Sequence, residues 1–111
     1  MSAIGRGRVV FVLTLKPAAT ARFLDAYERI RHEVARGVPG HLVDQVCQSP
    51  DDPDHWLITS EWRSIDDFRS WERTPEHRIL AAPLRECIAT ARSLQYIVRA
   101  ETSAAASATA A

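Results

Sequence analysis

The sequence predicts an α+β fold in which one antiparallel sheet of four strands carries its helices on a single face. Four segments have the alternating or β-branched composition of strands, at residues 8–15, 41–48, 55–62 and 93–99. Between them, apolar residues recur every three or four positions, as on one face of a helix. The resulting order, strand-helix-strand-strand-helix-helix-strand, is the split βαβ order of ferredoxin-like folds.

The first strand and first helix are separated by Pro17. Residues 8–15 (RVVFVLTL) are rich in β-branched and aromatic side chains and predict a strand buried on both faces. Proline cannot donate to a strand ladder and suits the start of a helix. The helix predicted over residues 18–35 presents one apolar stripe, made of Phe23, Tyr27, Ile30 and Val34. Gly37 stands where a glycine caps a helix C-terminus.

The second and third strands form a predicted hairpin. Residues 49–54 (SPDDPD) contain no large apolar side chain and separate two strand-like segments, as expected of an antiparallel connection. In the third strand, Trp56, Ile58 and Trp62 share one face because they lie an even number of residues apart.

Two short helices and a final strand complete the predicted fold. Ser64 and Thr74 stand at N-cap positions, and Pro75 follows Thr74 at the first helical position. Helical spacing continues through Leu80, Leu84, Cys87, Ile88 and Ala91, and Pro83 is expected to break or kink this segment. The last strand, residues 93–99, alternates Leu94, Tyr96 and Val98.

Length and charge exclude several classes of protein. A chain of 111 residues has room for one core, which we place at residues 8–100, between a flexible lead (1–7) and a disordered Ala/Ser tail (101–111). Fourteen basic and fourteen acidic side chains cancel, which argues against a nucleic-acid partner. No apolar run approaches the ~20 residues of a membrane span, and no signal-peptide core is present, so we expect a cytoplasmic protein without membrane contact.

The predicted sheet has apolar residues on both faces. In its first strand, Val10 and Val12 alternate with Val9, Phe11 and Leu13. Helices cover only one face in a split βαβ fold. An exposed apolar face of this size usually marks an interaction surface, so we expect a second copy of the chain to cover it in a two-fold homodimer.

The residues that usually bind metals or phosphates form no recognisable motif. Cys47 and Cys87 make no CxxC pair, and the histidines at positions 32, 41, 55 and 77 lack zinc-site spacing. We expect both cysteines to be buried free thiols. The sequence has no glycine-rich phosphate loop and no nucleophile elbow.

One extended pattern resembles the antibiotic biosynthesis monooxygenase family. It consists of Trp62, Ser64, Phe68, Trp71 and His77, preceded by the segment VPG at residues 38–40 and followed by a closing strand with Tyr96. The resemblance covers roughly residues 8–100. It implies a dimeric α+β barrel. It also implies oxidation of a phenolic anthrone to a quinone by molecular oxygen, without metal or flavin.

Carried over position by position, the resemblance makes Trp62 a wall of the substrate cavity. Cofactor-free members of the family have an asparagine four residues before this tryptophan, where this chain has Ile58. Haem-degrading relatives have an axial histidine ten residues after the tryptophan that aligns with Trp71, and here that position is Ala81.

The candidate site residues follow from these observations. His77, in the first turn of a helix, is the proposed base, because the helix dipole keeps an imidazole neutral there; Trp62 and His41 complete the catalytic candidates. The candidates for substrate binding are Phe11, Trp56, Trp71, Arg78, Arg85 and Tyr96. The alternative for the aromatic residues is packing in the core, and for His77 and the arginines a solvated helix surface.

Three functions fit these residues. The first is a cofactor-free monooxygenase that acts on an aromatic polyketide. The second is a polyketide cyclase on the same fold, which moves protons without consuming oxygen. The third is a non-catalytic dimer that binds a small ligand.

Overall fold

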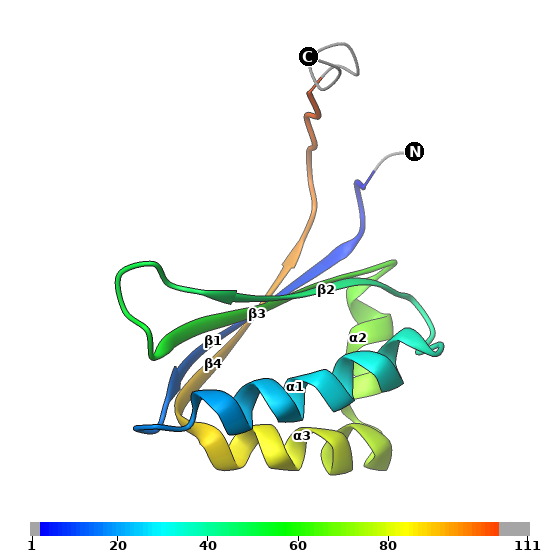
Figure 1. Cartoon of the computed structure of the whole chain (residues 1–111). Coiled ribbons are helices and arrows are strands. Elements are labelled where there is room, and N and C mark those ends of the chain that lie inside the picture. Colours follow the sequence, from blue (N-terminus) through cyan, green and yellow to red (C-terminus); the bar gives the residue numbers. More distant parts are fainter. Residues whose placement is uncertain (1–2, 105–111) are drawn as a thin grey trace.

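The four strands form one antiparallel sheet in the order β2-β3-β1-β4, and the three helices cover one of its faces (Figure 1). The computed structural model describes residues 3–104. The elements in chain order are β1 (Gly7–Leu15), α1 (Thr20–Ala35), β2 (His41–Gln48), β3 (His55–Trp62), α2 (Ile65–Glu72), α3 (Pro75–Cys87) and β4 (Ile88–Ile97). This confirms the predicted element order and the α+β fold class.

The central strands β1 and β3 determine which residues face the helices. Phe11 pairs with Ile58 of β3 on one side and with Ser93 of β4 on the other. Because side chains alternate along a strand, Val9, Phe11 and Leu13 point to the helices while Val10 and Val12 point away. The apolar run of β1 thus reflects its place between two neighbouring strands.

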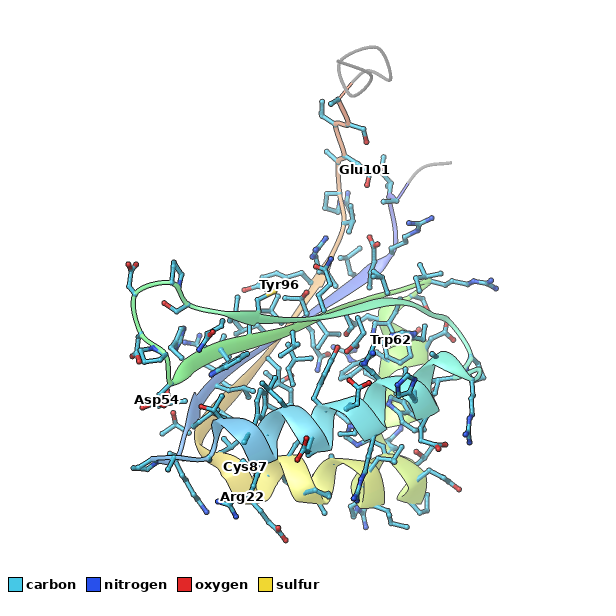
Figure 2. All side chains as sticks on the ribbon, viewed as in Figure 1. Arg22, Asp54, Trp62, Cys87, Tyr96 and Glu101 are labelled. Carbon is cyan, nitrogen blue, oxygen red and sulfur yellow. The ribbon has the colours of Figure 1, made fainter. Side chains whose placement is uncertain are left out.

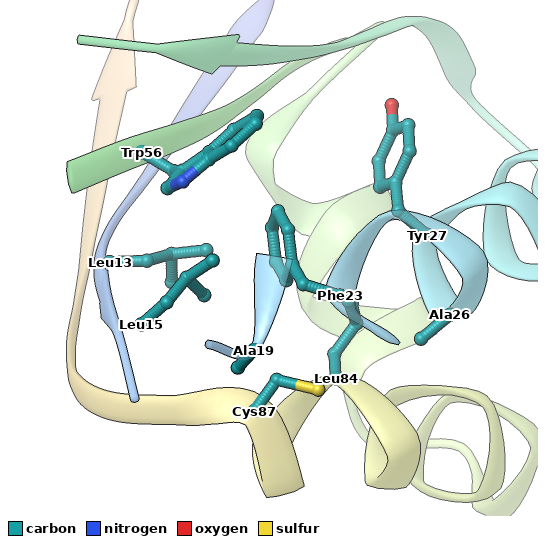
Figure 3. Packing of buried hydrophobic residues seen from close by; sticks show 9 residues of the cluster. All are labelled: Leu13, Leu15, Ala19, Phe23, Ala26, Tyr27, Trp56, Leu84 and Cys87. Carbon is teal, nitrogen blue, oxygen red and sulfur yellow. The ribbon is translucent and has the colours of Figure 1, made fainter. Parts of the chain in front are cut away.

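The main core lies where β1 and β3 meet α1 and α3 (Figure 3). Phe23 is fully buried, and its ring centroid lies 5.3 Å from that of Trp56. Leu13, Leu84 and Cys87 close this core from the sheet and from α3. A second, smaller cluster joins Val9, Trp62 and Phe68 and continues toward Trp71.

Three of the predicted helix ends are confirmed: the starts of α2 and α3 and the C-terminal end of α1. The Ser64 hydroxyl accepts a hydrogen bond from the backbone N–H of Asp67 at 3.2 Å, and Thr74 Oγ1 accepts one from the N–H of His77 at 3.1 Å. Gly37 follows the C-cap of α1 with φ +136°, a left-handed value that favours glycine. The Ser64 and Thr74 caps determine where α2 and α3 begin, and so where Trp71 and His77 lie.

The boundary between α3 and β4 differs from the prediction. The helix was expected to continue to Ala91, but it ends at Cys87, and Ile88 to Ala91 already belong to β4. Pairing with the central strand accounts for the difference, since Leu15 pairs with Ile88 and Leu13 with Ala91. Tertiary pairing therefore overrides a local spacing that suits a helix.

The expected break at Pro83 is also absent, because α3 is a single helix from Pro75 to Cys87. Proline lacks the N–H that would bond to the carbonyl of Ile79. Pro83 is exposed, and Ile79 is 73% exposed, so the carbonyl without a helical donor lies on the outer side of the helix, where water can reach it.

The face of the sheet away from the helices is uncovered in the single chain. We call it the open face; it carries Val10 and Val12 of β1, Leu57 of β3, Leu94 and Tyr96 of β4, and Val43 and Cys47 of β2. Cys47 was expected to be buried, but it is exposed, because it lies on an edge strand and points away from the helices. Cys87 is buried as predicted.

The ends of the described chain run away from the sheet on the same side (Figure 1). Within the segment predicted as a flexible lead, Ala3 is buried, and the backbone N–H of Gly5 donates to the carbonyl of Val98 at 2.9 Å. Residues 101–104 are exposed and have no regular structure. The rest of the predicted tail, residues 105–111, lies outside the described residues.

Candidate active site

A pocket of about 380 Å³ lies between the helix-facing side of the sheet and the three helices. This volume falls in the usual range of sites for small organic molecules, roughly 300–1,000 Å³. Most of the wall is apolar and comes from β1, β3, α1 and α3. The polar side chains of the wall are Tyr27, Asp44, Ser60, Glu72, His77, Arg78 and Arg85.

Trp62 forms part of the wall at the end of β3 and is 2% exposed. Its indole Nε1–H donates to Ser60 Oγ at 2.9 Å, so a buried donor is satisfied by a residue two positions away on the same face. The rings of Phe68 and His41 meet the indole edge-on, with centroids 5.4 Å and 5.1 Å away. Trp62 is therefore held in one orientation in the wall of the pocket.

His77 enters the pocket from the first turn of α3. Its ring lies edge-on to that of Trp71, with centroids 5.5 Å apart. Burial lowers the pKa of His77 below its ordinary value; Glu72 opposes this shift and Arg85 adds to it. The imidazole is accordingly favoured in the neutral form, in which one ring nitrogen can accept a proton.

Arg78 and Arg85 line the same side of the pocket, on α3. Both are exposed, and the guanidinium of Arg85 donates to the backbone carbonyl of Arg78 at 3.0 Å. This bond holds the Arg85 side chain along the helix. The two cations therefore stand at the solvent side of the pocket, where they can meet an anionic group of a ligand.

Asp44 and Tyr27 are pocket residues that sequence reasoning missed. Asp44 comes from β2 and Tyr27 from α1, and the Tyr27 hydroxyl donates to Asp44 Oδ2 at 2.6 Å. Burial, and next the hydrogen bond to Asp44, raise the pKa of Tyr27. The sequence held one sign of this contact. Asp44 is an acidic residue inside a predicted strand, on the same strand face as the apolar Val46.

Two of the expected substrate-binding residues do not reach the pocket. Trp56 packs in the main core, 5% exposed, and its indole N–H donates to the carbonyl of Pro53 at 2.9 Å. Tyr96 is 55% exposed and lies on the open face, on the far side of the sheet from the pocket (Figure 2). Phe11, Trp71, Arg78 and Arg85 do line it.

His41 lies at the border of a second, more open groove. This groove, of about 730 Å³, runs between α1 and β2, and Tyr27 and Asp44 border it as well as the pocket. His41 Nε2 lies 3.5 Å from Asp44 Oδ1 and, among the side chains of residues 3–104, is a buried nitrogen without a hydrogen-bond partner. Its ring thus sits behind Trp62 and beside Asp44 rather than in the pocket wall.

Residues 7–82 match the family model for antibiotic biosynthesis monooxygenase, which is more than half of the chain. The chain belongs to the antibiotic biosynthesis monooxygenase family. The family resemblance inferred from Trp62, Trp71 and His77 is therefore confirmed. Within the described part of this family member, no group of three His, Cys, Asp or Glu side chains is arranged to hold a metal ion, and no helix is long and apolar enough to cross a membrane.

Several relatives of this family member come from Streptomyces. The 42.8 kDa protein in the whiE locus of Streptomyces coelicolor is 47% identical over 97 residues, which cover 87% of this chain and 24% of the relative. Protein SchA of Streptomyces halstedii is 44% identical over 97 residues, 87% of this chain and 25% of SchA. Polyketide synthase CurD of Streptomyces cyaneus is 39% identical, over 87% of this chain and 26% of CurD. The chain thus spans about a quarter of the length of these curated relatives.

Solved structures share the fold. SnoaB from Streptomyces nogalater, described as a cofactor-independent oxygenase, superposes with a TM-score of 0.77 at 22% identity, over 87% of this chain and 96% of SnoaB. A conserved protein from Methanosarcina mazei Go1 gives a TM-score of 0.78 at 19% identity, over 86% and 94% of the two chains. At these identities the likeness shows that the chain shares the fold of these structures, and it shows the fold alone.

Proposed function

We propose that this chain is a cofactor-independent monooxygenase that oxidises a phenolic, anthrone-like polyketide to a quinone with molecular oxygen. The proposal rests on an apolar pocket of about 380 Å³ with His77, an imidazole favoured in its neutral form, in the wall. Family membership supports it. So do a relative named as a polyketide synthase and a structural neighbour described as a cofactor-independent oxygenase.

The reaction replaces the two hydrogens of the anthrone methylene with one oxygen atom. Methylene and O₂ are consumed, and a carbonyl and one water are formed. His77 first takes a proton from the methylene, which leaves an electron-rich enolate delocalised over the rings. The enolate passes one electron to O₂, and the two radicals combine to a carbon-bound peroxide. The imidazolium returns its proton to the peroxide and gives a hydroperoxide. The second methylene hydrogen then leaves as a proton while the O–O bond breaks, so that the carbonyl forms and the proton and the departing hydroxide make the one water.

In this proposal the rest of the pocket binds and shields the substrate. Trp62 and Trp71 offer aromatic surfaces to a flat ring system, and Phe11 contributes from the floor. Arg78 and Arg85 stand on the α3 side, where a phenolate or carboxylate of the substrate would meet positive charge. The apolar wall excludes water from the enolate, which would otherwise be protonated again.

The test is quinone formation from a model anthrone by metal-stripped protein, under air and under argon. We expect catalysed quinone formation and one O₂ consumed per quinone under air, and none under argon. The variant His77→Gln should lower the rate about 10²- to 10⁴-fold, the usual contribution of a positioned base. His32→Gln is the matched control, because His32 is exposed on α1 away from the pocket. A wild-type rate equal to that of the uncatalysed reaction would refute the proposal.

A polyketide cyclase is the second candidate, and Ile58 is the observation that favours it. Ile58 lines the pocket at the position where cofactor-free oxygenases of this family have an asparagine. A cyclase needs an apolar cavity and a proton-transferring group, but no polar group to assist oxygen. Cyclised product formed from a poly-keto substrate at the same rate under argon and under air would select this function over oxidation.

A further inference from the structure

Asp44 is a carboxyl group in the wall of an otherwise largely apolar pocket. It lies on β2 and pairs with Ser60 of β3, so its side chain points to the helix side of the sheet. Tyr27 reaches it from α1, across the 17 residues that separate them in the sequence. In Figure 1, β2 lies above α1, and α3, which carries His77, lies below. The carboxyl group and the imidazole therefore line the pocket from different elements, β2 and α3.

The hydrogen bonds of Asp44 leave one oxygen with unused acceptor capacity. A carboxylate has about four acceptor sites on its two oxygens. Oδ2 accepts the bond from Tyr27 at 2.6 Å, whereas Oδ1 lies 3.5 Å from His41 Nε2, longer than a well-formed N–H···O bond. Burial raises the pKa of Asp44, while the bond from Tyr27 and the nearby His41 oppose the shift. A further donor would offset part of the cost of burying this carboxylate.

The neighbours of Asp44 indicate which donor fits. The nearby wall from α1 consists of Tyr27, Ile30 and Val34, so the site favours an apolar ligand with one polar group. Arg78 and Arg85 on the α3 side disfavour a ligand cation such as an amine. The remaining common donor is a neutral hydroxyl on an apolar ring.

We propose that Asp44 accepts a hydrogen bond from a hydroxyl group of the aromatic substrate and thereby selects hydroxylated rings, and that Tyr27 positions the Asp44 carboxylate for this contact. This inference rests on the proposed function, since it names a feature of that same substrate. It places the recognition of the hydroxyl on the β2 wall and the chemistry on the α3 wall. A pocket that hydrogen-bonds a hydroxyl disfavours analogues without it, because a partly buried acceptor then loses a donor.

Binding of two matched probes tests this inference without any oxidation. Equilibrium dialysis under argon gives the Kd of 2-naphthol and of 2-methylnaphthalene, which differ in a hydroxyl against a methyl group. The quantity to compare is the ratio of the two Kd values, because the cost of removing each probe from water cancels between protein variants. In Asp44→Leu this preference for naphthol should fall about tenfold or more, the range expected for a hydrogen bond to a charged group. Asp25→Asn, on the exposed face of α1, should leave it unchanged.

Two further variants guard against a fold defect. Asp44→Asn keeps an oxygen that can accept the hydrogen bond from the Tyr27 hydroxyl. It should lower the preference for 2-naphthol less than Asp44→Leu does. Tyr27→Phe should lower the preference while the Kd of 2-methylnaphthalene stays within about twofold, a selective effect that a merely structural role would not produce. An unchanged preference in both Asp44 variants, or a wild-type protein that does not bind 2-naphthol, would overturn the inference. Hydroxyl selection without quinone formation would instead refute only the oxidation.

Discussion

His77 owes its favoured neutral form mainly to burial. The largest influence on its pKa is the loss of water around the ring, and the charge of Glu72, the next largest, acts against it. An imidazole of this kind is ready to accept a proton but stabilises the folded state only while it stays neutral. Suitability as a base and sensitivity to acid therefore have the same cause at this residue.

This cause predicts a dependence of stability on pH. The pKa of His77 is lowered in the folded state, so in acid the unfolded chain binds the proton first. The contribution of His77 is fully present above pH ~6.5 and is lost as the pH falls from there to the lowered folded pKa. Urea unfolding between pH 7.5 and 5 should show a decline in wild type that His77→Gln reduces. An equal decline in both proteins would contradict the assignment.

The candidate residues were predicted unevenly, for reasons that differ from residue to residue. Trp62 and His77 reached the pocket as expected, because a strand end and a capped helix start place them there. Trp56 shares the strand face of Trp62 but packs on Phe23, since α1 covers that end of the strand. Asp44 and Tyr27 were missed because their contact joins two elements, and no periodicity reports such a contact.

At the scale of elements, the close approach of α2 to β1 determines the shape of one end of the pocket. Gly7 opens β1 directly beside the start of α2. A Cβ at position 7 would lie 2.7 Å from the backbone nitrogen of Ile65 and 3.0 Å from the carbonyl carbon of Ser64. Only a residue without a side chain lets α2 pack this tightly, and α2 carries Phe68 and Trp71 to the pocket.

Gly7→Ala should therefore destabilise the protein by about 1–3 kcal/mol, the usual cost of overpacking, because both contacts are with backbone. Gly7→Val should cost more. The measurement is the midpoint of urea unfolding for the three proteins, together with the Kd of 2-naphthol. This Kd should rise in both variants, because α2 moves away from the pocket. If both variants match wild type in stability, the approach of α2 to β1 is looser than described.

The elements themselves were largely predictable, because strand alternation and helix caps are local. Ser64, Thr74 and Gly37 identified the helix ends correctly. Ile88 to Ala91 was assigned to a helix because the spacing of their apolar residues is helical, whereas β1 recruits them to the sheet. The paired residues, such as Leu15 and Ile88, lie more than seventy positions apart in the chain, and local spacing carries no information about their pairing.

At the scale of the whole molecule, the open face is the main unpaired surface that the fold leaves. Tyr96 is 55% exposed and Val43 is 43% exposed at its two sides, and Val10 and Val12 lie between them on β1. Helices cover the other face only (Figure 1). The homodimer expected from the sequence, with the open faces of two chains in contact, stays a prediction.

Sedimentation equilibrium tests this prediction. At micromolar concentration we expect a species of twice the 12.4 kDa chain. Val12→Glu, on the central strand of the open face, should shift the population to single chains because it would bury a charge at the interface. Ile79→Glu is the control, since Ile79 is 73% exposed on α3, away from the open face. A wild-type species of 12.4 kDa would contradict sheet-to-sheet pairing.

The positions of the three tryptophans allow binding in the pocket to be followed by the fluorescence of the protein itself. Trp62 and Trp71 border the cavity, whereas Trp56 is enclosed in the main core. We expect an aromatic ligand that enters the pocket to change the emission of Trp62 and Trp71 and to leave that of Trp56 nearly constant. Occupancy can thus be followed by fluorescence in unlabelled protein, and in a Trp56→Phe background the whole signal originates at the pocket.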